Sequence, residues 1–505
     1  MRSRKALLNT VSSLLVQLAS VIVGFVVPIA YIGTFGSETY GAIGTINQYL
    51  GFIALLEAGV GGVTRAALYK PLAEGRVDAV SSIVRATERF FRTIGGVFVG
   101  YSIIIACIFP FITYFTGEWV LSFALTLVIA AGTLAQYMFG ITYSLLLQAD
   151  QRSYVANVFQ VVSSVANAAV IVVMVRAGFD VVVVQAGSSF VFVLRPVILG
   201  AYVRRKYRLV KDAVPDKTAI ADRWNGLGHH LAFYLRSNIA TIALSMFAPL
   251  TEVSVFAVYN LIAQGLQRLV NAFSSGVEAA FGNMIANGER EALQVNFRVY
   301  EVVSSTLVAV VFSTAIATVQ PFMAVYMKGV TDANYQQPLL GVVLLAATAV
   351  YCFRLPYNSV VLAAGHYRQT RNGAFAEAGI CVALSFLLAG PFGATGVSTA
   401  LLVATVFRTL QYGVYASRVI LERPLRVFAG RCLYILSVTT ACSLLGLYAG
   451  TFFNVGGYCA WGLLALGVVA LSSLLVVLSL HAFYPQDLMI VLEKMKRIFS
   501  GSGEA

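Results

Sequence analysis

The sequence predicts an all-α, polytopic membrane protein with 14 transmembrane helices. Its composition is the first reason, because the 505-residue chain is 59% apolar and only 11% charged, whereas soluble domains carry about 25% charged residues. Its mean hydropathy of +0.81 is the second. The third is the length of the unbroken apolar runs, which is typical of membrane helices and excludes an outer-membrane barrel with its short alternating strands.

Each predicted helix is an apolar run long enough to cross a bilayer, for which about 20 helical residues suffice. The first follows Arg2, Arg4 and Lys5 and is too long for a signal-peptide core, so we expect it to be retained. The runs are 8–32, 42–67, 90–114, 120–147, 155–175, 181–203, 231–249, 255–283, 301–325, 338–364, 373–391, 396–417, 432–452 and 458–483.

The basic residues orient these helices. With the N-terminus inside, the cytoplasmic segments hold 27 of the 35 Lys and Arg residues, the opposite side holds two, and six lie within helices. Such an asymmetric split predicts that both termini are cytoplasmic. It also accounts for the net charge of +13 without a nucleic-acid partner. We predict a multi-pass protein of the bacterial cytoplasmic (inner) membrane.

The chain has no obvious catalytic domain. The longest inside segment is 204–230, and the sequence has no phosphate-cradling G-x-x-x-x-G-K-[ST] motif, so we expect neither an enzyme nor a protein that hydrolyses ATP itself. The six cysteines are scattered through apolar runs without a C-x-x-C pair, which predicts no disulfide framework and no metal site.

The chain repeats itself internally. Residues 144–152 align with 360–368 at an offset of 216, and the pattern R-x4-G-x-Y-x2-R at 195–205 recurs at 408–418 at an offset of 213. Each copy contains six helices, an even number, so both copies begin on the same side of the membrane. Two such copies are related by an axis along the membrane normal. We predict two pseudosymmetric six-helix lobes, 1–215 and 216–418, plus two extra helices and a cytoplasmic tail in 419–505. Such lobes suit alternating access, with a site between them.

One predicted helix, 255–283, carries a polar stripe. Residues at steps of three or four along it share one face, and a membrane helix must turn such a face towards protein or water. The stripe therefore either lines a wet cavity or hydrogen-bonds neighbouring helices; the charges of Arg268 and Glu278 favour the cavity. The stripe consists of Asn260, Gln264, Gln267, Arg268, Asn271, Ser275 and Glu278.

Several short patterns then resemble one family. Leu8-Asn9, TFGSETYG at 34–41, EAGVG at 57–61 and PLAEG at 71–75, together with helix count, topology and repeat, are similar to the polysaccharide flippases. These export O-antigen, capsule or teichoic-type repeat units and belong to the multidrug/oligosaccharidyl-lipid/polysaccharide (MOP) exporter superfamily. The resemblance covers essentially the whole chain, and 14 helices, against 12 in the drug extruders, favour the polysaccharide or lipid II branches.

The resemblance implies a function. It implies translocation of a polyprenyl-pyrophosphate-linked oligosaccharide from the cytoplasmic to the outer leaflet, through a cationic central cavity, by ion-coupled rocking of the lobes. The implied driving ion is a proton or sodium gradient, and no other cofactor is expected. Glycosyltransferases and a polymerase of the same pathway are further candidate partners.

Arginines within the predicted helices are the first candidate ligands for a pyrophosphate, because guanidinium binds phosphate in a bidentate way. For the repeat-related Arg195 and Arg408 we favour an architectural role, and for any of the others the alternative is an ion pair or snorkelling. The candidate ligands for pyrophosphate or sugar are Arg268, Arg236, Arg354, Arg65, Gln264, Asn271 and Tyr259.

Two acidic residues are candidates for the ion-coupling site. Glu57 lies in the middle of the second predicted helix, where protonation would make it tolerable in lipid surroundings. Glu278 lies nearer a helix end, and is the weaker candidate. For Glu57, an intramolecular ion pair is the alternative.

Three rival functions remain open at this point. A multidrug or organic-cation antiporter of the same fold would need carboxylates rather than arginines in its cavity. A membrane polymerase or glycosyltransferase would need a larger loop to hold a sugar donor. A lipid II flippase fits the same observations as the function that the resemblance implies.

Overall fold

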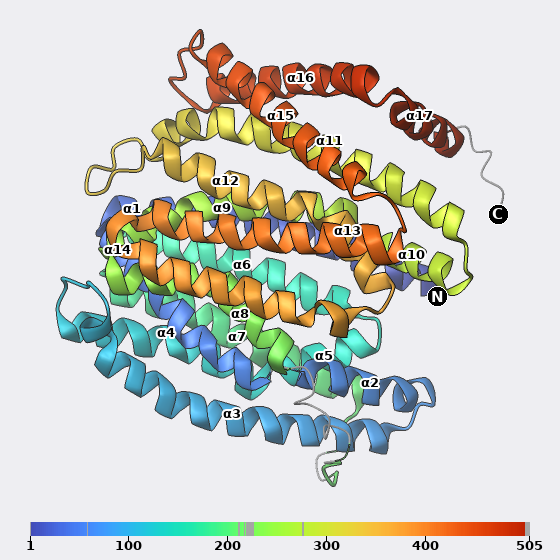
Figure 1. Ribbon diagram of the computed structural model, residues 1–505. Coiled ribbons are helices and arrows are strands. Elements are labelled where there is room, and N and C mark those ends of the chain that lie inside the picture. Colours follow the sequence, from blue (N-terminus) through green and yellow to red (C-terminus); the bar gives the residue numbers. More distant parts are fainter. Residues whose placement is uncertain are drawn as a thin grey trace. The chain divides into compact units, whose positions relative to one another are not determined.

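The computed structural model describes residues 2–57, 59–210, 213–216, 218, 227–274 and 277–499. Every named element in these ranges is a helix, and one isolated β-bridge joins Tyr114 and Pro249. This confirms the all-α prediction. The elements are labelled in Figure 1.

By internal contacts the chain divides into two compact units, Met1–Ala257 and Val258–Ala505. The predicted division at residues 215 and 418 stays a prediction. Unit 1 contains α1 (Arg2–Gly51), the 3-10 helix η1 (Phe52–Glu57), α2 (Val60–Ala73), α3 (Val77–Ile112), α4 (Trp119–Phe139), α5 (Ile141–Ala149), α6 (Ser153–Arg176), α7 (Val181–Tyr207), α8 (Leu227–Phe247) and the start of α9 (Leu250–Ser274).

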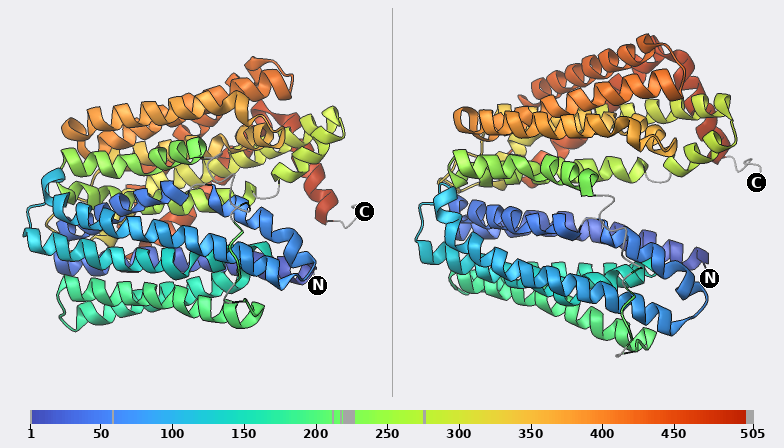
Figure 2. Two further views of the ribbon diagram at one scale, coloured as in Figure 1. Left: turned by 90° about the horizontal axis from the view of Figure 1, so that it is seen from below. Right: turned by 60° about the horizontal axis from the view of Figure 1, so that its bottom comes forward.

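Unit 2 begins within α9, and in both further views the long helices of each unit run lengthwise beside one another (Figure 2). It contains α10 (Val277–Ala286), α11 (Arg290–Tyr326), α12 (Pro338–Phe353), α13 (Leu355–Ala363), α14 (Tyr367–Tyr415), the π-helix η3 (Ala416–Ile420), α15 (Leu425–Gly450), α16 (Tyr458–Phe483) and α17 (Pro485–Phe499).

The described residues form 11 segments that are long and apolar enough to cross a membrane, so the protein is a multi-pass membrane protein. Two of these segments, Leu7–Glu57 and Tyr367–Ile420, are 51 and 54 residues long, enough for two crossings each. Each contains one glycine outside the helical region, Gly36 at φ 85° and Gly393 at φ 52°. Such backbone angles favour glycine because it has no Cβ. The count of 14 stays a prediction.

Contacts within α14 show that it is a helical hairpin. Nη1 of Arg408 donates to the carbonyl of Thr370 at 2.8 Å, and its Nε lies 3.7 Å from Oε2 of Glu377. These residues lie at similar distances on either side of Gly393, so the two arms run antiparallel from a turn there. The predicted helices 373–391 and 396–417 are therefore both present in this element.

The first arm of α1 packs on α6, and its second arm packs on α3. Asn9 accepts from the backbone N–H of Tyr154, and Ser12 from the side chain of Asn157, a constant offset of 145 that makes α1 and α6 parallel. Tyr101 of α3 donates to the carbonyl of Tyr49 at 2.6 Å. The sequence predicts that helices 8–32 and 155–175 cross the membrane in the same direction, and the corresponding parts of α1 and α6 are parallel in the structure.

The internal repeat recurs in the order and breaks of the elements. The nine-residue helices α5 and α13 begin at Ile141 and Leu355, an offset of 214, and α3 and α11 begin 213 residues apart. Backbone positions with positive φ recur at offsets of 213 to 215, in the pairs Gly75 and Gly288, Gln151 and Gly365, Gly178 and Gly393, and Arg208 and Glu422. The repeat seen in the residues is therefore also a repeat of local structure.

Three helices predicted as continuous are interrupted within the described part of the chain. The run 42–67 is broken by η1 and by Gly59 at φ 92°, the run 120–147 at Gly140, and the run 338–364 at Arg354. The run 255–283 is described as two helices, α9 and α10, with residues 275–276 outside the described part. Hydrophobicity alone predicted that these segments are helical but not the breaks within them.

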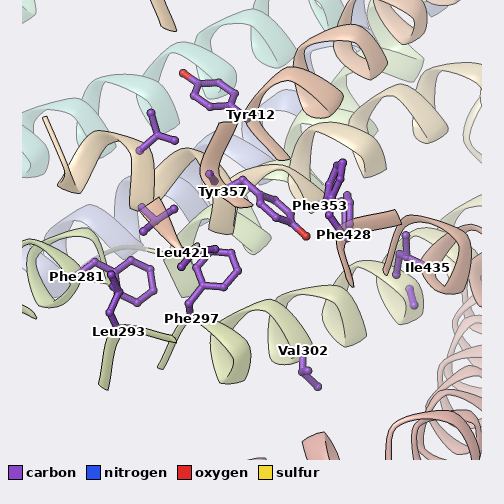
Figure 3. Close-up of a cluster of buried hydrophobic side chains, with 14 of the residues drawn as sticks. Phe281, Leu293, Phe297, Val302, Phe353, Tyr357, Tyr412, Leu421, Phe428 and Ile435 are labelled. Atoms are coloured by element: carbon purple, nitrogen blue, oxygen red, sulfur yellow. The ribbon is translucent and has the colours of Figure 1, made fainter. Parts of the chain in front are cut away.

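Aromatic residues form much of the core of unit 2. The ring of Tyr357, on α13, lies among those of Phe297, Phe353 and Phe428, with centroids 5.5, 5.8 and 5.1 Å away (Figure 3). These rings join α11, α12, α13 and α15. In unit 1, Tyr143 of α5 occupies the corresponding place in a cluster with Leu68, Val84 and Leu199. The short helices α5 and α13 are thus each fixed by a buried tyrosine.

Candidate functional site

Two of the interruptions occur at corresponding places in the repeat, since α5 follows the break at Gly140 and α13 the break at Arg354, 214 residues later. In membrane transporters, helices broken at corresponding positions of two repeats are a sequence and structural pointer to the binding site. A break exposes backbone polar groups, which are tolerated in a membrane only against protein or water. Two of the predicted site residues, Glu57 and Arg354, lie directly at such breaks.

Glu57 ends η1, two residues before the left-handed Gly59. Its side chain is half-buried, and among the described residues of unit 1 it forms no hydrogen bond and no ion pair. Its carboxylate lies within electrostatic range of Tyr137, on α4. The ion-pair alternative for Glu57 finds no partner in this part of the chain. Its role in ion coupling stays a prediction.

Aromatic side chains surround this break. Tyr234 of α8 donates to the carbonyl of Gln48 at 3.0 Å, and its ring lies 5.1 Å from that of Phe52. A Cβ on Gly51 would lie 2.9 Å from the hydroxyl of Tyr234, so glycine permits this close approach. The carbonyls released where α1 ends are therefore met by tyrosine hydroxyls, as a broken membrane helix requires.

Arg354 is part of a buried cluster in unit 2. Its Nη1 lies 2.9 Å from Oε1 of Glu377, and its guanidinium lies 4.9 Å from the ring of Tyr351. Arg408 reaches the same carboxylate and also donates to Tyr412 at 2.9 Å. Arg354, Glu377 and Arg408 are only 7%, 5% and 4% exposed. Two arginines thus share one carboxylate, which leaves a net charge of +1.

In this conformation Arg354 therefore forms the ion pair that was the alternative to ligand binding. To bind a pyrophosphate as predicted, Arg354 would have to contact both Glu377 and the ligand. Arg408 has the architectural position that the sequence favoured, because it joins the two arms of α14. Whether either arginine contacts a substrate stays a prediction.

The polar stripe is present along α9. Arg268 and Gln264 are exposed, and Asn271 is half-buried. Within the described residues, none of these three side chains forms a hydrogen bond or an ion pair. The alternative that the stripe hydrogen-bonds neighbouring helices therefore finds no support at these positions. The role of the three residues as ligands stays a prediction. Glu278 lies on α10, beyond residues 275–276, which are outside the described part of the chain, and its side chain is exposed.

Tyr259 lies on the same helix but is fully engaged. Its hydroxyl donates to the carbonyl of Tyr335 at 2.8 Å and accepts from Gln320 at 2.8 Å and from the backbone N–H of Gln337 at 3.3 Å. A tyrosine hydroxyl has one donor and two acceptor positions, so this side chain has none left for a sugar in this conformation.

Of the two remaining predicted ligands, one is engaged with a neighbour and one is outside the described part. Arg65, on α2, donates to Oε1 of Gln148, on α5, at 2.6 Å. It thereby joins the two short helices that follow the breaks of unit 1. The side chain of Arg236 lies outside the described residues.

Unit 2 also contains an apolar groove. It has a volume of about 500 Å³ and lies among α11, α12, α14 and α15. Phe353 and Thr409, which line it, are the sequence neighbours of Arg354 and Arg408. Its other lining residues include Ile316, Ala346, Ile435, Leu436, Leu444 and Leu447.

Comparisons with known proteins identify the fold. No family model matches the chain, and no curated protein matches it in sequence. A lipid II flippase, MurJ in an inward closed conformation, has a TM-score of 0.71 at 12% identity, over 96% of this chain and 100% of that chain. An inward-facing multidrug resistance MATE family transporter of the MOP superfamily has a TM-score of 0.60 at 16% identity, over 80% of this chain and 95% of that chain.

A third structure, the MATE multidrug transporter DinF-BH in complex with a small molecule, has a TM-score of 0.58 at 16% identity, over 82% of this chain and 95% of that chain. This chain has the MOP-type transporter fold. The fold predicted from the resemblance is therefore confirmed at this level. The narrower polysaccharide-flippase assignment belongs to the proposal below.

The MOP-type fold of this chain also contains charged clusters that the sequence analysis missed. In unit 1, Tyr143 donates to Oε1 of Glu88 at 2.5 Å, and Nε of Arg204 donates to the same hydroxyl at 2.6 Å. In unit 2, Tyr357 donates to Oε1 of Glu301 at 2.5 Å. The two glutamates are 213 residues apart and the two tyrosines 214. If the repeat offset had been applied to each glutamate and tyrosine of the sequence, it would have shown that Glu88 corresponds to Glu301 and Tyr143 to Tyr357.

Glu301 also pairs with one arginine from the segment before α15 and one from α15 itself. Nη2 of Arg423 donates to it at 2.6 Å, and Nε of Arg431 lies 3.5 Å away. Burial lowers the pKa of the Arg423 guanidinium, but the hydrogen bond and charge of Glu301 more than offset this, so the net pKa is raised. Arg423 therefore stays charged and fixes the start of α15 to α11.

Proposed function

We propose that this protein is a flippase of the bacterial inner membrane, with both termini in the cytoplasm. Its cargo is a polyprenyl-pyrophosphate-linked oligosaccharide, which it moves from the cytoplasmic to the outer leaflet by alternating access. A proton or sodium gradient drives the cycle. The protein acts as a transporter and not as an enzyme, and glycosyltransferases and a polymerase supply and consume the cargo.

The observation that carries this proposal is the apolar groove of unit 2, two of whose lining residues, Phe353 and Thr409, are the sequence neighbours of the buried Arg354 and Arg408. A lipid-linked pyrophosphate is an amphiphile with the same division. Its polyprenyl tail needs apolar surface, and its head group needs cations, because an unpaired charge in hydrocarbon costs several kcal/mol or more. Few other cargoes require both features side by side.

The polar face of α9 supports a path for the head group. Arg268 provides a guanidinium that no described residue neutralises, and Gln264 and Asn271 add amides that hydrogen-bond sugars as donors and acceptors. The membrane potential assists the same movement. Two negative charges that move outward against an inside-negative 100 mV gain roughly 4–5 kcal/mol.

Glu57 is the proposed coupling residue. It is a half-buried carboxylate at a helix break, and it has no cationic partner among the described residues. A group in this position can take up a proton or a sodium ion at one stage of the cycle and release it at another, because each bound cation removes the cost of a desolvated charge. Glu278, exposed on α10, is the second candidate.

Reconstitution tests the proposal. The purified chain is placed in vesicles with a fluorescent polyprenyl-pyrophosphate oligosaccharide, and flipping is measured as protection of the sugar from an external glycosidase. Arg268→Ala is expected to lower the rate about 10- to 100-fold, because a charge-assisted hydrogen bond contributes about 1.5–3 kcal/mol. Arg371→Ala removes an exposed arginine of α14 and serves as the matched control. Equal rates for the two variants would remove Arg268 as a ligand.

Two other cargoes of the same fold are tested in the same vesicles. An organic-cation antiporter is favoured by Glu57 and Glu278, two carboxylates that pair with no residue described in the structure, and would expel the cationic dye ethidium in exchange for protons. A lipid II flippase would accept a peptidyl disaccharide head group at least as well as the oligosaccharide. Export of the dye without flipping of either lipid would overturn the proposed function.

A further inference from the structure

A second cavity of unit 2 is basic and lies outside the proposed transport path. It has a volume of about 610 Å³, within the usual range of ligand pockets. Its walls come from the start of α11, the segment 421–431, and the junction of α16 and α17. The charged residues that line it are Arg298, Glu301, Arg423, Arg426, Arg431 and Asp487.

The carboxylates of this cavity do not balance its arginines. Glu301 and Asp487 are each only 1% exposed, and they pair with Arg423, Arg431 and Arg298. Four arginines against two carboxylates leave a surplus of two positive charges. Arg426 is exposed and forms no ion pair or hydrogen bond with any residue that the structure describes. The surplus therefore reaches the open edge of the cavity, at the unpaired Arg426 and at Arg298, which shares Asp487 with Arg431 and whose side chain is 41% exposed.

The position of the cavity along the helices is that of a membrane border. Arg426 is the second residue of one candidate membrane segment, Leu425–Gly450, and Tyr484 directly follows another, Tyr458–Phe483. On the proposed topology, this end of both segments faces the cytoplasm, where anionic head groups attract basic residues.

The helix α17 adds an apolar surface at the same border. Its first turn is held by the buried Asp487, and Lys494 donates to the side chain of Asn296 at 2.5 Å, so it lies against the start of α11. Met489 and Leu492 on this helix are 57% and 54% exposed. An amphipathic helix with exposed apolar side chains lies in the interface between head groups and acyl chains. This placement favours a lipid over a soluble phosphate as the ligand.

We propose that the basic cavity of unit 2 binds the phosphate group of an anionic membrane lipid, through Arg426 and Arg298. A phosphate diester provides one negative charge and several acceptor oxygens, which suit two guanidinium groups at the edge of a cavity. Its acyl chains then lie beside Met489 and Leu492. This lipid is a structural ligand of the cytoplasmic border and not the transported cargo; the inference rests on the proposed topology but not on the proposed cargo.

Native mass spectrometry of the full chain in detergent tests this site, because no bilayer surface attracts lipids non-specifically there. The wild-type protein is expected to retain phosphatidylglycerol and to lose phosphatidylethanolamine. Arg426→Ala is expected to weaken phosphatidylglycerol binding about tenfold or more, and Arg426→Lys less. Arg418→Ala is the matched control, because Arg418 is an exposed arginine nearby that does not line the cavity.

Three results would overturn the inference. Arg426→Ala could bind phosphatidylglycerol as the wild type does, or phosphatidylethanolamine could bind as tightly as phosphatidylglycerol. Inorganic phosphate at millimolar concentration could displace the lipid, which would make a soluble phosphate the ligand. The vesicle assay separates these outcomes from the proposed function, because a loss of flipping in Arg268→Ala does not depend on lipid retention at Arg426.

Discussion

The buried cluster of unit 2 makes a quantitative prediction for Glu377→Gln. In the wild-type protein, one carboxylate lies 2.9 Å from Nη1 of Arg354 and 3.7 Å from Nε of Arg408. The substitution raises the net charge of the buried cluster from +1 to +2. At an effective dielectric constant of 20, a pair of charges about 4 Å apart interacts by about 4 kcal/mol. Measured costs of breaking a buried pair are about 3–5 kcal/mol, and we expect a loss in this range.

Thermal unfolding in detergent measures this loss. Glu377→Gln is expected to lower Tm by at least about 5 °C. The double variant with Arg408→Gln restores a net charge of +1 and is expected to recover a large part of the lost stability. Glu291→Gln, at an exposed carboxylate of α11, is the control and is expected to change the free energy of unfolding by no more than about 0.5 kcal/mol. A Tm for Glu377→Gln equal to that of the control would refute the charge-sharing argument.

Three further predictions concern other parts of the chain. Glu57→Gln is expected to abolish the response of flipping to a proton or sodium gradient while uncoupled flipping continues, and an unchanged ion dependence in vesicles would exclude Glu57. Asp487→Asn is expected to release the first turn of α17, because Arg431 and Arg298 lose their partner; faster hydrogen exchange in 485–499 than in Glu493→Gln would show this, and equal exchange would contradict it. Gly393→Ala is expected to cost about 1–3 kcal/mol, because φ is 52° there. Gly379→Ala, at a helical position with no atom near the added Cβ, is its control in thermal unfolding, and equal Tm values would argue against a strained turn.

The helices and the repeat could be predicted from the sequence because both depend on local or periodic information. An apolar run of sufficient length predicts a membrane helix whatever its neighbours are. The matches around Arg152 and Arg368 preserved enough of the repeat to give its offset, and the structure shows a similar offset in α5 and α13. These features need no knowledge of which residues meet in space.

The breaks could not be predicted in the same way. Gly59 and Gly140 are two of 43 glycines in the chain, and hydropathy does not distinguish a glycine that ends a helix from one that permits close packing. Arg354 sits at a break without any glycine. Comparing the two copies of the repeat is more informative, because the breaks recur at matching positions where hydropathy is equally high on both sides.

The partners of the charged residues depend on contacts between distant segments. The sequence placed Arg354 within a helix, but its pairing with Glu377 requires α12 and α14 to meet. Glu88 and Glu301 were missed because they lie among basic residues near predicted helix ends, where charges are usually solvated. The structure shows instead that each accepts a hydrogen bond from a buried tyrosine.

The repeat-related arginines, Arg195 and Arg408, differ in a way that bears on their role. At offsets of 213–214, Arg354 and Glu377 correspond to Gly140 and Ser163 in unit 1, so Arg195 has neither the second arginine nor the carboxylate. It is half-buried, and in the part of unit 1 that the structure describes it forms no ion pair. Each copy therefore holds a net charge of +1, reached by one arginine in unit 1 and by two arginines and one glutamate in unit 2.

The architectural role that the sequence favoured for Arg195 stays a prediction. We propose as an alternative that the positive charge itself is what the two copies share, because burying an unpaired charge destabilises the fold. Arg195→Gln is expected to raise Tm and to lower the rate of flipping in vesicles, whereas an architectural residue would lower both. If Arg195→Gln flips the lipid at the wild-type rate, the charge of Arg195 has no role in transport.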